Sequence, residues 1–237
     1  MEIIIHGTGV MGTIVSQTAR EKNITVSGFA DELTKETGDV IIDFSHFSRM
    51  NSLLEFAQEK KIPLVIATTG YGTEIEEKIK QAAEKIPVLL SSNMSLGINL
   101  MQDILEKIVP VLYGNYDIEV VEAHHNKKID SPSGTAKTLV ETIEAGCRDT
   151  MKKQYGREGI SPREKNEIGI HSLRGGTIVG EHSVLFCGND EIIEIKHTAL
   201  SKKIFAEGAI KAAQFLAGQK PGLYTMKDIF GGKNNDW

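Results

Sequence analysis

The residues with the clearest potential for chemistry lie in one segment, Val120 to Ala136, which reads VVEAHHNKKIDSPSGTA. Within twelve residues it places two imidazoles (His124 and His125), two ammonium groups (Lys127 and Lys128) and a Ser-Gly-Thr turn. Imidazole and ammonium groups are common proton donors and acceptors in catalysis. The segment therefore predicts a site that moves protons on a bound molecule.

The end of this segment, SPSGT from Ser131 to Thr135, is typical of a helix start. Ser131 would cap the helix and Pro132 would take its first position, where the missing N–H costs nothing. A helix N-terminus offers backbone N–H groups and the positive end of the helix dipole, so it attracts anions. Gly134 would let an anion come close to that backbone. We expect a carboxylate or phosphate to bind here.

The segment allows two other interpretations. A histidine pair followed by a basic loop is also typical of a solvated turn, and capped helices are common. A metal site is disfavoured, because adjacent strand residues point to opposite faces and His124 and His125 would not converge on one ion. Neighbouring lysines disfavour a cation further, so no metal is expected and the anion site is the preferred interpretation.

The chain begins with a second motif. Ile3 to Ile5 reads as a short buried strand, and it is followed by a helix that continues to about Lys22 and by an apolar run from Ile24 to Phe29. Between the first strand and the helix stands a GxGxxG turn, made of Gly7, Thr8, Gly9, Val10, Met11 and Gly12. Asp31 follows the second strand and could accept hydrogen bonds from a ribose diol. Strand, glycine turn, helix, strand and acidic residue together form a dinucleotide-binding fingerprint.

Strands and helices then alternate, with strands expected at 40–44, 63–67 and 87–90 and helices at 49–60 and 74–85. This pattern predicts a parallel sheet with right-handed crossovers, and ligands bind beyond the carboxyl ends of such strands. The strand-end candidates for lining a nicotinamide ribose are Phe44-Ser45, Ala67-Thr68-Thr69-Gly70 and Ser91-Ser92-Asn93-Met94. The alternative is that these residues are simply turn formers.

The pattern changes after Asn93. We expect helices at 96–112, 132–145 and 204–217, a strand at 117–124, a polar loop at 151–167 and an irregular tail at 221–230. Strands at 167–173, 177–186 and 191–198 are joined by glycine-containing turns, which favours antiparallel pairing. The sequence thus predicts an α/β protein. A Rossmann-type domain spans 1–93 and is completed by 204–237, and a mixed α+β domain for substrate binding and oligomerisation spans 94–203.

Composition limits the remaining function classes. A net charge of −5 over 237 residues gives no reason to expect a nucleic-acid partner. Cys147 and Cys187 have no metal-like spacing, which favours reduced thiols in the cytoplasm. No apolar run approaches the length of a membrane span, and no signal peptide is apparent, so a soluble cytoplasmic protein is expected.

With both motifs in place, the chain resembles the 4-hydroxy-tetrahydrodipicolinate reductase (dihydrodipicolinate reductase) family over essentially its whole length. The segment from Glu122 to Ala136 matches the family signature E-A-H-H-x-x-K-x-D-x-P-S-G-T-A, which is long and specific. Further matching segments are Ala67 to Gly70, Ser92 to Ser95 and Arg174 to His182.

The resemblance implies NAD(P)H-dependent reduction of the cyclic imine formed from aspartate semialdehyde and pyruvate, which gives tetrahydrodipicolinate with loss of water. It implies acid/base work for His124 and proton donation by Lys128. It assigns binding of the substrate carboxylates to His125, Gly134 and Thr135. Family members are usually homotetramers built through the sheet of the second domain, so we expect the same here.

One departure from the family bears on the cofactor. Family members that use both nicotinamide cofactors often have an arginine directly after the acidic residue, whereas Glu32 follows Asp31 here. Two carboxylates would repel a 2′-phosphate, so NADH is predicted to be preferred over NADPH. The rival functions are another amino-acid dehydrogenase with the same first domain, and a nucleotide sensor without catalysis. Both would leave the proton donors beside the anion site unused.

Overall fold

The computed structural model describes residues 1–230, which form two compact units. The first unit comprises Met1–Leu96 and the described residues from Lys202 onward, and the second comprises Gly97–Ser201. The α/β class expected from the sequence is confirmed, with a parallel sheet in the first unit and a mixed sheet in the second. Residues 231–237, which we assigned to the first domain, lie outside the described residues.

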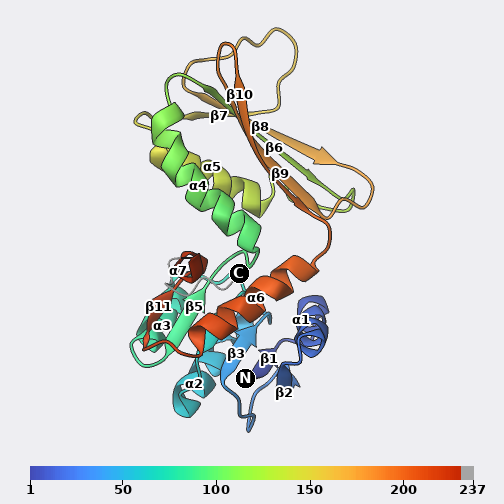
Figure 1. The fold of residues 1–237 in the computed structure, drawn as a ribbon, viewed down its shortest axis with the longest axis vertical. Coiled ribbons are helices and arrows are strands. Elements are labelled where there is room, and N and C mark those ends of the chain that lie inside the picture. The colour runs from blue at the N-terminus through green and yellow to red at the C-terminus, as the bar shows by residue number, and fades with distance from the viewer. Residues whose placement is uncertain (231–237) are drawn as a thin grey trace. The chain divides into compact units, whose positions relative to one another are not determined.

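The first unit is a six-stranded sheet in which every neighbouring pair is parallel, in the order β2-β1-β3-β4-β5-β11 (Figure 1). Chain order reverses between β1 and β3, the position where parallel α/β sheets bind ligands. The strands are β1 (Glu2–His6), β2 (Thr25–Ala30), β3 (Val40–Asp43), β4 (Leu64–Ile66), β5 (Pro87–Leu90) and β11 (Gly222–Tyr224). The helices are α1 (Val10–Glu21), the 3₁₀ turn η1 (Phe47–Arg49), α2 (Met50–Lys60), α3 (Thr73–Ala83), α6 (Lys203–Leu216) and α7 (Met226–Phe230).

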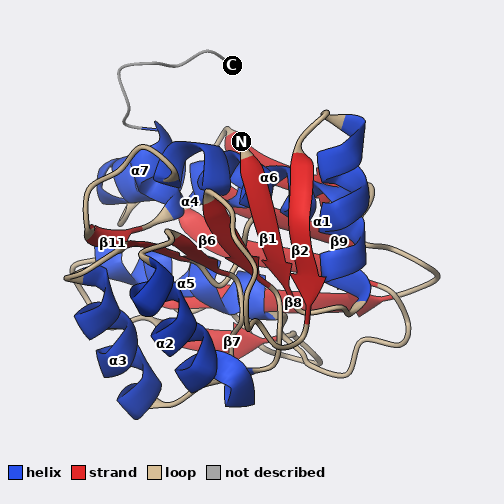
Figure 2. Cartoon of the chain, turned by 90° about the horizontal axis from the view of Figure 1, so that it is seen from below, coloured by secondary structure: helices blue, strands red, loops and turns tan. Residues whose placement is uncertain are grey.

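Both faces of this sheet are buried, as the apolar runs in its strands require. Successive residues of β1 alternate between two cores: Ile3 and Ile5 pack with side chains of α1 and α6, whereas Ile4 packs with side chains of α2 and α3. Figure 2 shows α2 and α3 side by side. This double cover holds the carboxyl ends of β1, β3 and β4 in fixed positions.

The expected irregular tail at 221–230 is wrong. Its residues form β11, which pairs in parallel with β5, and the short helix α7. A strand of three residues is too short to show the two-residue alternation on which strand prediction depends.

The second unit is a five-stranded sheet in the order β10-β9-β6-β8-β7, with the helices α4 (Leu96–Leu112) and α5 (Gly134–Gly146). The strands are β6 (Asp117–His124), β7 (Lys152–Tyr155), β8 (Glu167–Arg174), β9 (Gly180–Cys187) and β10 (Ile192–Ala199). Ile118 and Val120 of β6 pack with Leu139 and Val140 of α5, so the helices cover one face of this sheet. None of the helices formed by residues 1–230 has the length and apolar character that crossing a membrane requires.

Part of the expected antiparallel pairing is wrong. β9 and β10 form the expected hairpin, closed by a hydrogen bond from Gly188 N to Glu191 O, but β6 lies between β8 and β9. The turn at Gly175-Gly176 does not close a hairpin. Instead Gly175 N donates to His124 O, and Asn126 N donates to Gly176 O, so this turn pairs with the residues that follow β6. A glycine turn indicates a reversal of the chain, and it does not say which strand lies beside it.

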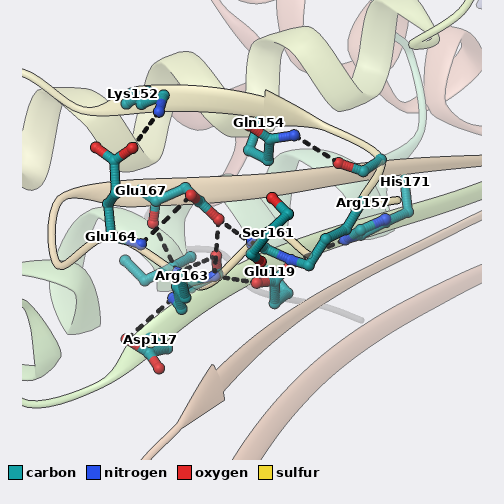
Figure 3. A network of polar contacts seen from close by, with 12 residues as sticks. Asp117, Glu119, Lys152, Gln154, Arg157, Ser161, Arg163, Glu164, Glu167 and His171 are labelled. Atoms are coloured by element: carbon teal, nitrogen blue, oxygen red, sulfur yellow. Dashed lines mark hydrogen bonds and ion pairs between the residues drawn. The ribbon is translucent and has the colours of Figure 1, made fainter. Parts of the chain in front are cut away.

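The expected polar loop at 151–167 contains the strand β7, which pairs in parallel with β8. Its charged residues are held by ion pairs (Figure 3). Arg163 pairs with Asp117 and Glu119 of β6, and its Nη2 donates to Glu167 O at 2.6 Å. Arg157 pairs with the Glu167 carboxylate. The polarity of this segment therefore reflects anchoring to the sheet as well as exposure to solvent.

Candidate active site

The three glycines of the first motif have three separate roles. Gly7 has a φ of +103°, and a Cβ there would lie 2.6 Å from Phe44 O, so the turn itself requires glycine. A Cβ on Gly12 would lie 1.9 Å from Gly7 O, so Gly12 allows α1 to pack against the turn. A Cβ on Gly9 would meet nothing within 4 Å, so the fold itself does not require glycine here. The missing side chain leaves a space open beside the turn.

That open space lies at the start of α1. Gly9 is the N-cap residue of α1 and provides no side-chain cap for the helix N–H groups. Exposed N–H groups at a helix start, approached through a glycine, form the usual cradle for a pyrophosphate. The residues present therefore fit a dinucleotide.

A cleft of about 370 Å³ opens at the carboxyl ends of β1, β3 and β4. It brings together several residues predicted to bind the cofactor, and adds others that follow β3. It is lined by Gly9, Val10, Met11, Phe44, Ser45, His46, Phe47, Ala67, Thr68 and Thr69. His46 and Phe47 were missed in the sequence, because they follow the strand end by several residues and belong to no motif.

Asp31 is placed beside the glycine turn. Its carboxylate accepts hydrogen bonds from Thr8 N at 2.9 Å and Thr8 Oγ1 at 2.7 Å, and these bonds lower the pKa of Asp31. A second neighbour, Arg49, was missed: its guanidinium donates to Asp31 O and lies 3.9 Å from Asp31 Oδ1. Arg49 reaches this corner from η1, a position that sequence spacing does not indicate.

The fourth predicted cofactor segment lies after β5 and does not contribute to the lining of the cleft. Ser91 Oγ donates to Asn93 O at 2.8 Å, and Ser92 is exposed. The Met94 side chain is 2% exposed and packs in the core of the first unit. A role for Met94 would therefore fall to its backbone.

In the second unit, strand alternation brings two chemical groups onto one face of β6. Ile118, Val120, Glu122 and His124 follow one another at two-residue spacing, and the first two are core residues. The Glu122 carboxylate is fully buried, and its Oε2 lies 2.6 Å from His124 Nδ1. His125 comes directly after the end of β6.

Glu122 is surrounded by donors. Burial alone would raise its pKa, but hydrogen bonds, led by that from Arg174, lower the pKa of Glu122 to about 2. Arg174 binds both carboxylate oxygens, with Nη1 2.9 Å from Oε2 and Nη2 2.7 Å from Oε1. Ser133 N donates to Oε1 at 3.1 Å. Glu122 is thus a buried carboxylate that stays ionised.

The helix start at Ser131 to Thr135 exists, but its predicted cap is wrong. Ser133 is the N-cap residue, since its Oγ accepts from Ala136 N at 3.1 Å, and the helix begins at Gly134. Pro132 therefore precedes the helix. Gly134 is exposed and Thr135 is half-buried, so this first turn is not packed into the core. It keeps the geometry of an anion site.

Lys128 lies beside these groups. Its Nζ is 2.7 Å from Asp130 Oδ1, and its side chain is 20% exposed. The positive charges of Lys128 and Arg174 help burial to lower the pKa of His124, against the effect of Glu122, which raises it. An imidazole, an ammonium and a helix N-terminus are therefore gathered at one end of the second unit, which is the combination that proton transfer to a bound acid requires.

The buried histidine His182 connects to the same group. Its Nε2 lies 2.9 Å from Ser133 Oγ, and its ring stands edge-on to that of His124 at 5.2 Å between centroids. Burial, helped by the charge of His124, lowers the pKa of His182 to about 4. His182, Arg174 and Ser133 lie in segments that match the family, but the sequence predicts no role for them. Only their positions around Glu122 identify them.

The shift of His182 predicts acid sensitivity. The unfolded chain binds a proton near pH 6.5 and the folded chain only near pH 4, so stability falls as pH drops through this window. Between pH 7 and pH 4.5 the wild-type protein should lose about 2–3 kcal/mol more of its free energy of unfolding than His182→Gln does. Urea unfolding of both proteins at the two pH values measures it. Equal losses in the two proteins would contradict the buried neutral histidine.

Comparison with known proteins agrees with this geometry. Residues 11–94 match the family model for the N-terminus of dihydrodipicolinate reductase, and residues 97–230 match the model for its C-terminus. A solved structure of a dipicolinate-bound dihydrodipicolinate reductase from Paenisporosarcina sp. TG-14 shares the fold, with a TM-score of 0.79 at 20% identity. The match covers 97% of this chain and 99% of the chain in the solved structure.

Two curated relatives are similar along almost their whole length. The 4-hydroxy-tetrahydrodipicolinate reductase of Brachyspira hyodysenteriae (strain ATCC 49526 / WA1) is 53% identical, with 97% of this chain and 99% of the relative covered. That of Clostridium novyi (strain NT) is 46% identical, with 98% and 99% covered. These matches agree with the glycine motif, with the histidine motif and with the places of both in the structure. The chain therefore belongs to the dihydrodipicolinate reductase family.

Proposed function

We propose that this protein is an oxidoreductase of lysine and diaminopimelate biosynthesis that reduces 4-hydroxy-tetrahydrodipicolinate with NAD(P)H. The reaction consumes one hydride and one proton, and it releases water and tetrahydrodipicolinate. The observation that carries the proposal is the grouping of His124 and Lys128 beside the exposed first turn of α5. This grouping offers proton donors next to a seat for a carboxylate.

The residues predicted to act on the substrate lie in the second unit, and each has a role there. The first turn of α5, at Gly134 and Thr135, and the side chain of His125 bind the two substrate carboxylates. Lys128 donates a proton to the ring as it is reduced, because its ammonium is held in place by Asp130 and remains partly accessible. His124 exchanges protons with the substrate through the ring nitrogen that Glu122 does not occupy.

The first unit binds the cofactor. The N-terminus of α1 binds the pyrophosphate beside Gly9, and the Asp31 carboxylate accepts hydrogen bonds from the ribose hydroxyls. The cleft beyond β3 and β4 receives the nicotinamide ribose, with Thr68 and Thr69 in its wall. When bound, the nicotinamide supplies the hydride. Ser91, Ser92, Asn93 and the Met94 backbone remain candidates to approach it from the end of β5.

We retain the prediction that NADH is preferred, now with Arg49 in view. Asp31 and Glu32 disfavour a 2′-phosphate, whereas the Arg49 guanidinium beside Asp31 offers a cation that such a phosphate could bind. Arg49→Ala should therefore lower kcat/KM for NADPH by about 10- to 100-fold and leave that for NADH nearly unchanged, since a charge-assisted hydrogen bond contributes about 1.5–3 kcal/mol. Steady-state kinetics with both cofactors checks this. An equal loss for both would assign Arg49 to holding the Asp31 loop, and a wild-type preference for NADPH would reject our cofactor prediction.

We also propose a cytoplasmic homotetramer that forms through the sheet of the second unit. Leu173 and Ile192 are large, exposed side chains on the face of the sheet opposite α4 and α5, and apolar side chains there fit a subunit interface. Cys147 and Cys187 are free thiols, in keeping with a reducing compartment. Light scattering on the purified protein measures the oligomeric state.

A coupled assay tests the proposed reaction. The cyclic imine is generated freshly from aspartate semialdehyde and pyruvate, and the absorbance of the reduced nicotinamide is followed with each cofactor. Loss of absorbance that depends on the imine supports the proposal. Oxidation with an amino acid or its keto acid instead would favour another dehydrogenase class, and cofactor binding without turnover would favour a nucleotide sensor.

A further inference from the structure

We infer that Glu122 is a positioning residue for the reaction: it holds the proton of His124 on Nδ1, presents Nε2 as the nitrogen that exchanges protons with the substrate, and aligns the first turn of α5 with it. The inference rests on the role proposed above for His124. It adds a buried carboxylate, outside reach of the substrate, that decides how this imidazole works.

The first step of the argument concerns the hydrogen bond between Glu122 and His124. An ionised carboxylate can only accept hydrogen bonds, so the 2.6 Å contact requires a proton on His124 Nδ1. With one proton on the neutral ring, Nε2 must carry the lone pair. A hydrogen bond at one ring nitrogen commonly fixes the chemistry of the other in this way.

The second step concerns the charge of Glu122. Both of its oxygens are fully engaged: Oε1 accepts from Arg174 Nη2 and Ser133 N, and Oε2 accepts from His124 Nδ1 and Arg174 Nη1. Arg174 is itself held by Asp130 O, to which its Nη2 donates at 2.7 Å. A carboxylate bound by so many donors cannot easily take the proton from His124. It therefore acts as a fixed charge that orients the ring.

The third step concerns the other side of the ring. A Cβ placed on Gly180 would lie 3.1 Å from His124 Nε2, which is tighter than a relaxed contact. Glycine at the first residue of β9, which is buried, therefore lets Nε2 lie close to this strand and helps to hold the ring in place. The His124 side chain is nevertheless 12% exposed, so part of it stays accessible to a bound molecule.

The fourth step links the imidazole to the anion site. Ser133 N donates to Glu122 Oε1, and Ser133 Oγ caps α5, so the same carboxylate fixes both the ring of His124 and the start of the helix. The charged and titratable groups around His124 are Glu122 on its own strand, Arg174 on β8, His182 on β9 and Lys128 in the following loop. Among these, Glu122 alone carries a negative charge, so removing this charge should change the pKa of His124 in one direction, downward.

The tautomer of His124 can be measured directly in the wild-type protein without substrate. Long-range ¹H–¹⁵N spectra of histidine-labelled protein distinguish a protonated ring nitrogen from an unprotonated one, and a His124→Asn variant assigns the signals. At about pH 8, above the usual histidine pKa, we expect a protonated Nδ1 and an unprotonated Nε2. A proton on Nε2 instead would overturn the inference, whatever reaction the protein catalyses.

A variant tests the consequence. Glu122→Gln keeps the shape of the side chain and removes its charge, so the titration of His124 should move to lower pH, because Glu122 raises the pKa of this imidazole. The kcat/KM for the cyclic imine should fall by about 100-fold, within the usual range for general acid–base catalysis. Its pH profile should shift with the titration, and the Kd for NADH should not change.

Glu167→Gln is the matched control. Glu167 is also buried, on β8, and pairs with Arg157 and Arg163, but it lies in the separate network of Figure 3. This control should lose stability while the titration of His124 and the pH profile stay at wild-type values. An unchanged titration in Glu122→Gln, or the same shift in both variants, would overturn the inference. If Glu122→Gln does not fold, the wild-type tautomer still decides. A protein with the expected tautomer that does not reduce the imine would reject the proposed function only.

Discussion

Lys128→Ala is expected to lower kcat for the cyclic imine by about 100- to 10,000-fold, the usual contribution of a general acid. The ammonium of Lys128 lies on the second unit, whereas the cofactor cradle belongs to the first. The Kd for NADH should therefore be unchanged. Steady-state kinetics and a fluorescence titration with NADH measure the two quantities separately.

The neighbouring lysine provides the matched control. Lys127 is exposed and has the same charge, so Lys127→Ala should change kcat by no more than about three-fold, as for other exposed charges. Asp130→Asn removes the partner of Lys128 and should produce an intermediate loss. If Lys128→Ala turned over as fast as the wild type, Lys128 would not be the proton donor.

The second large effect concerns the glycine turn, where two substitutions should fail for different reasons. Gly9→Val places a side chain in space that the fold leaves open, so the protein should unfold at nearly the wild-type temperature. The same side chain occupies the approach of the pyrophosphate to α1. We therefore expect the Kd for NADH to rise by about 100-fold or more, since the charge-assisted bonds at the helix start are lost.

Gly12→Val should behave differently. The motif alone predicts that this change blocks the cofactor and spares the fold, and the structure contradicts the second part. A Cβ at this position would lie 1.9 Å from Gly7 O, which is backbone, so α1 or the turn must move. The free energy of unfolding should fall by more than about 3 kcal/mol. Calorimetry on both variants checks the contrast. Normal NADH binding by Gly9→Val would remove the argument for the cradle.

The first unit could be predicted closely from the sequence because its signals are local. Apolar runs such as Ile3 to Ile5, the glycine turn and Asp31 occur in an order that few other folds use. Arg49 was not predictable in this way, since it reaches Asp31 from η1, which follows one further strand, β3, along the chain. Its position depends on how the sheet packs, and no spacing in the sequence records it.

The second unit shows the limit of local patterns more clearly. The strands β8, β9 and β10 were expected in nearly the observed places, but the insertion of β6 between β8 and β9 is a long-range choice. That insertion is what brings Arg174 and His182 to the two sides of Glu122. A glutamate in an apolar alternation, after Ile118 and Val120, was the available signal for a buried carboxylate with a special role.

In the proposed reaction a hydride passes from the nicotinamide to the ring of the cyclic imine, while residues of this chain supply the proton. A single-turnover reaction with NADH that carries deuterium at the transferable position tests it most directly, with mass spectrometry of the product. We expect one deuterium atom in tetrahydrodipicolinate for each cofactor oxidised, and loss of this transfer in Lys128→Ala. Oxidation of the cofactor without deuterium in the product, or no reaction with the imine at all, would contradict it.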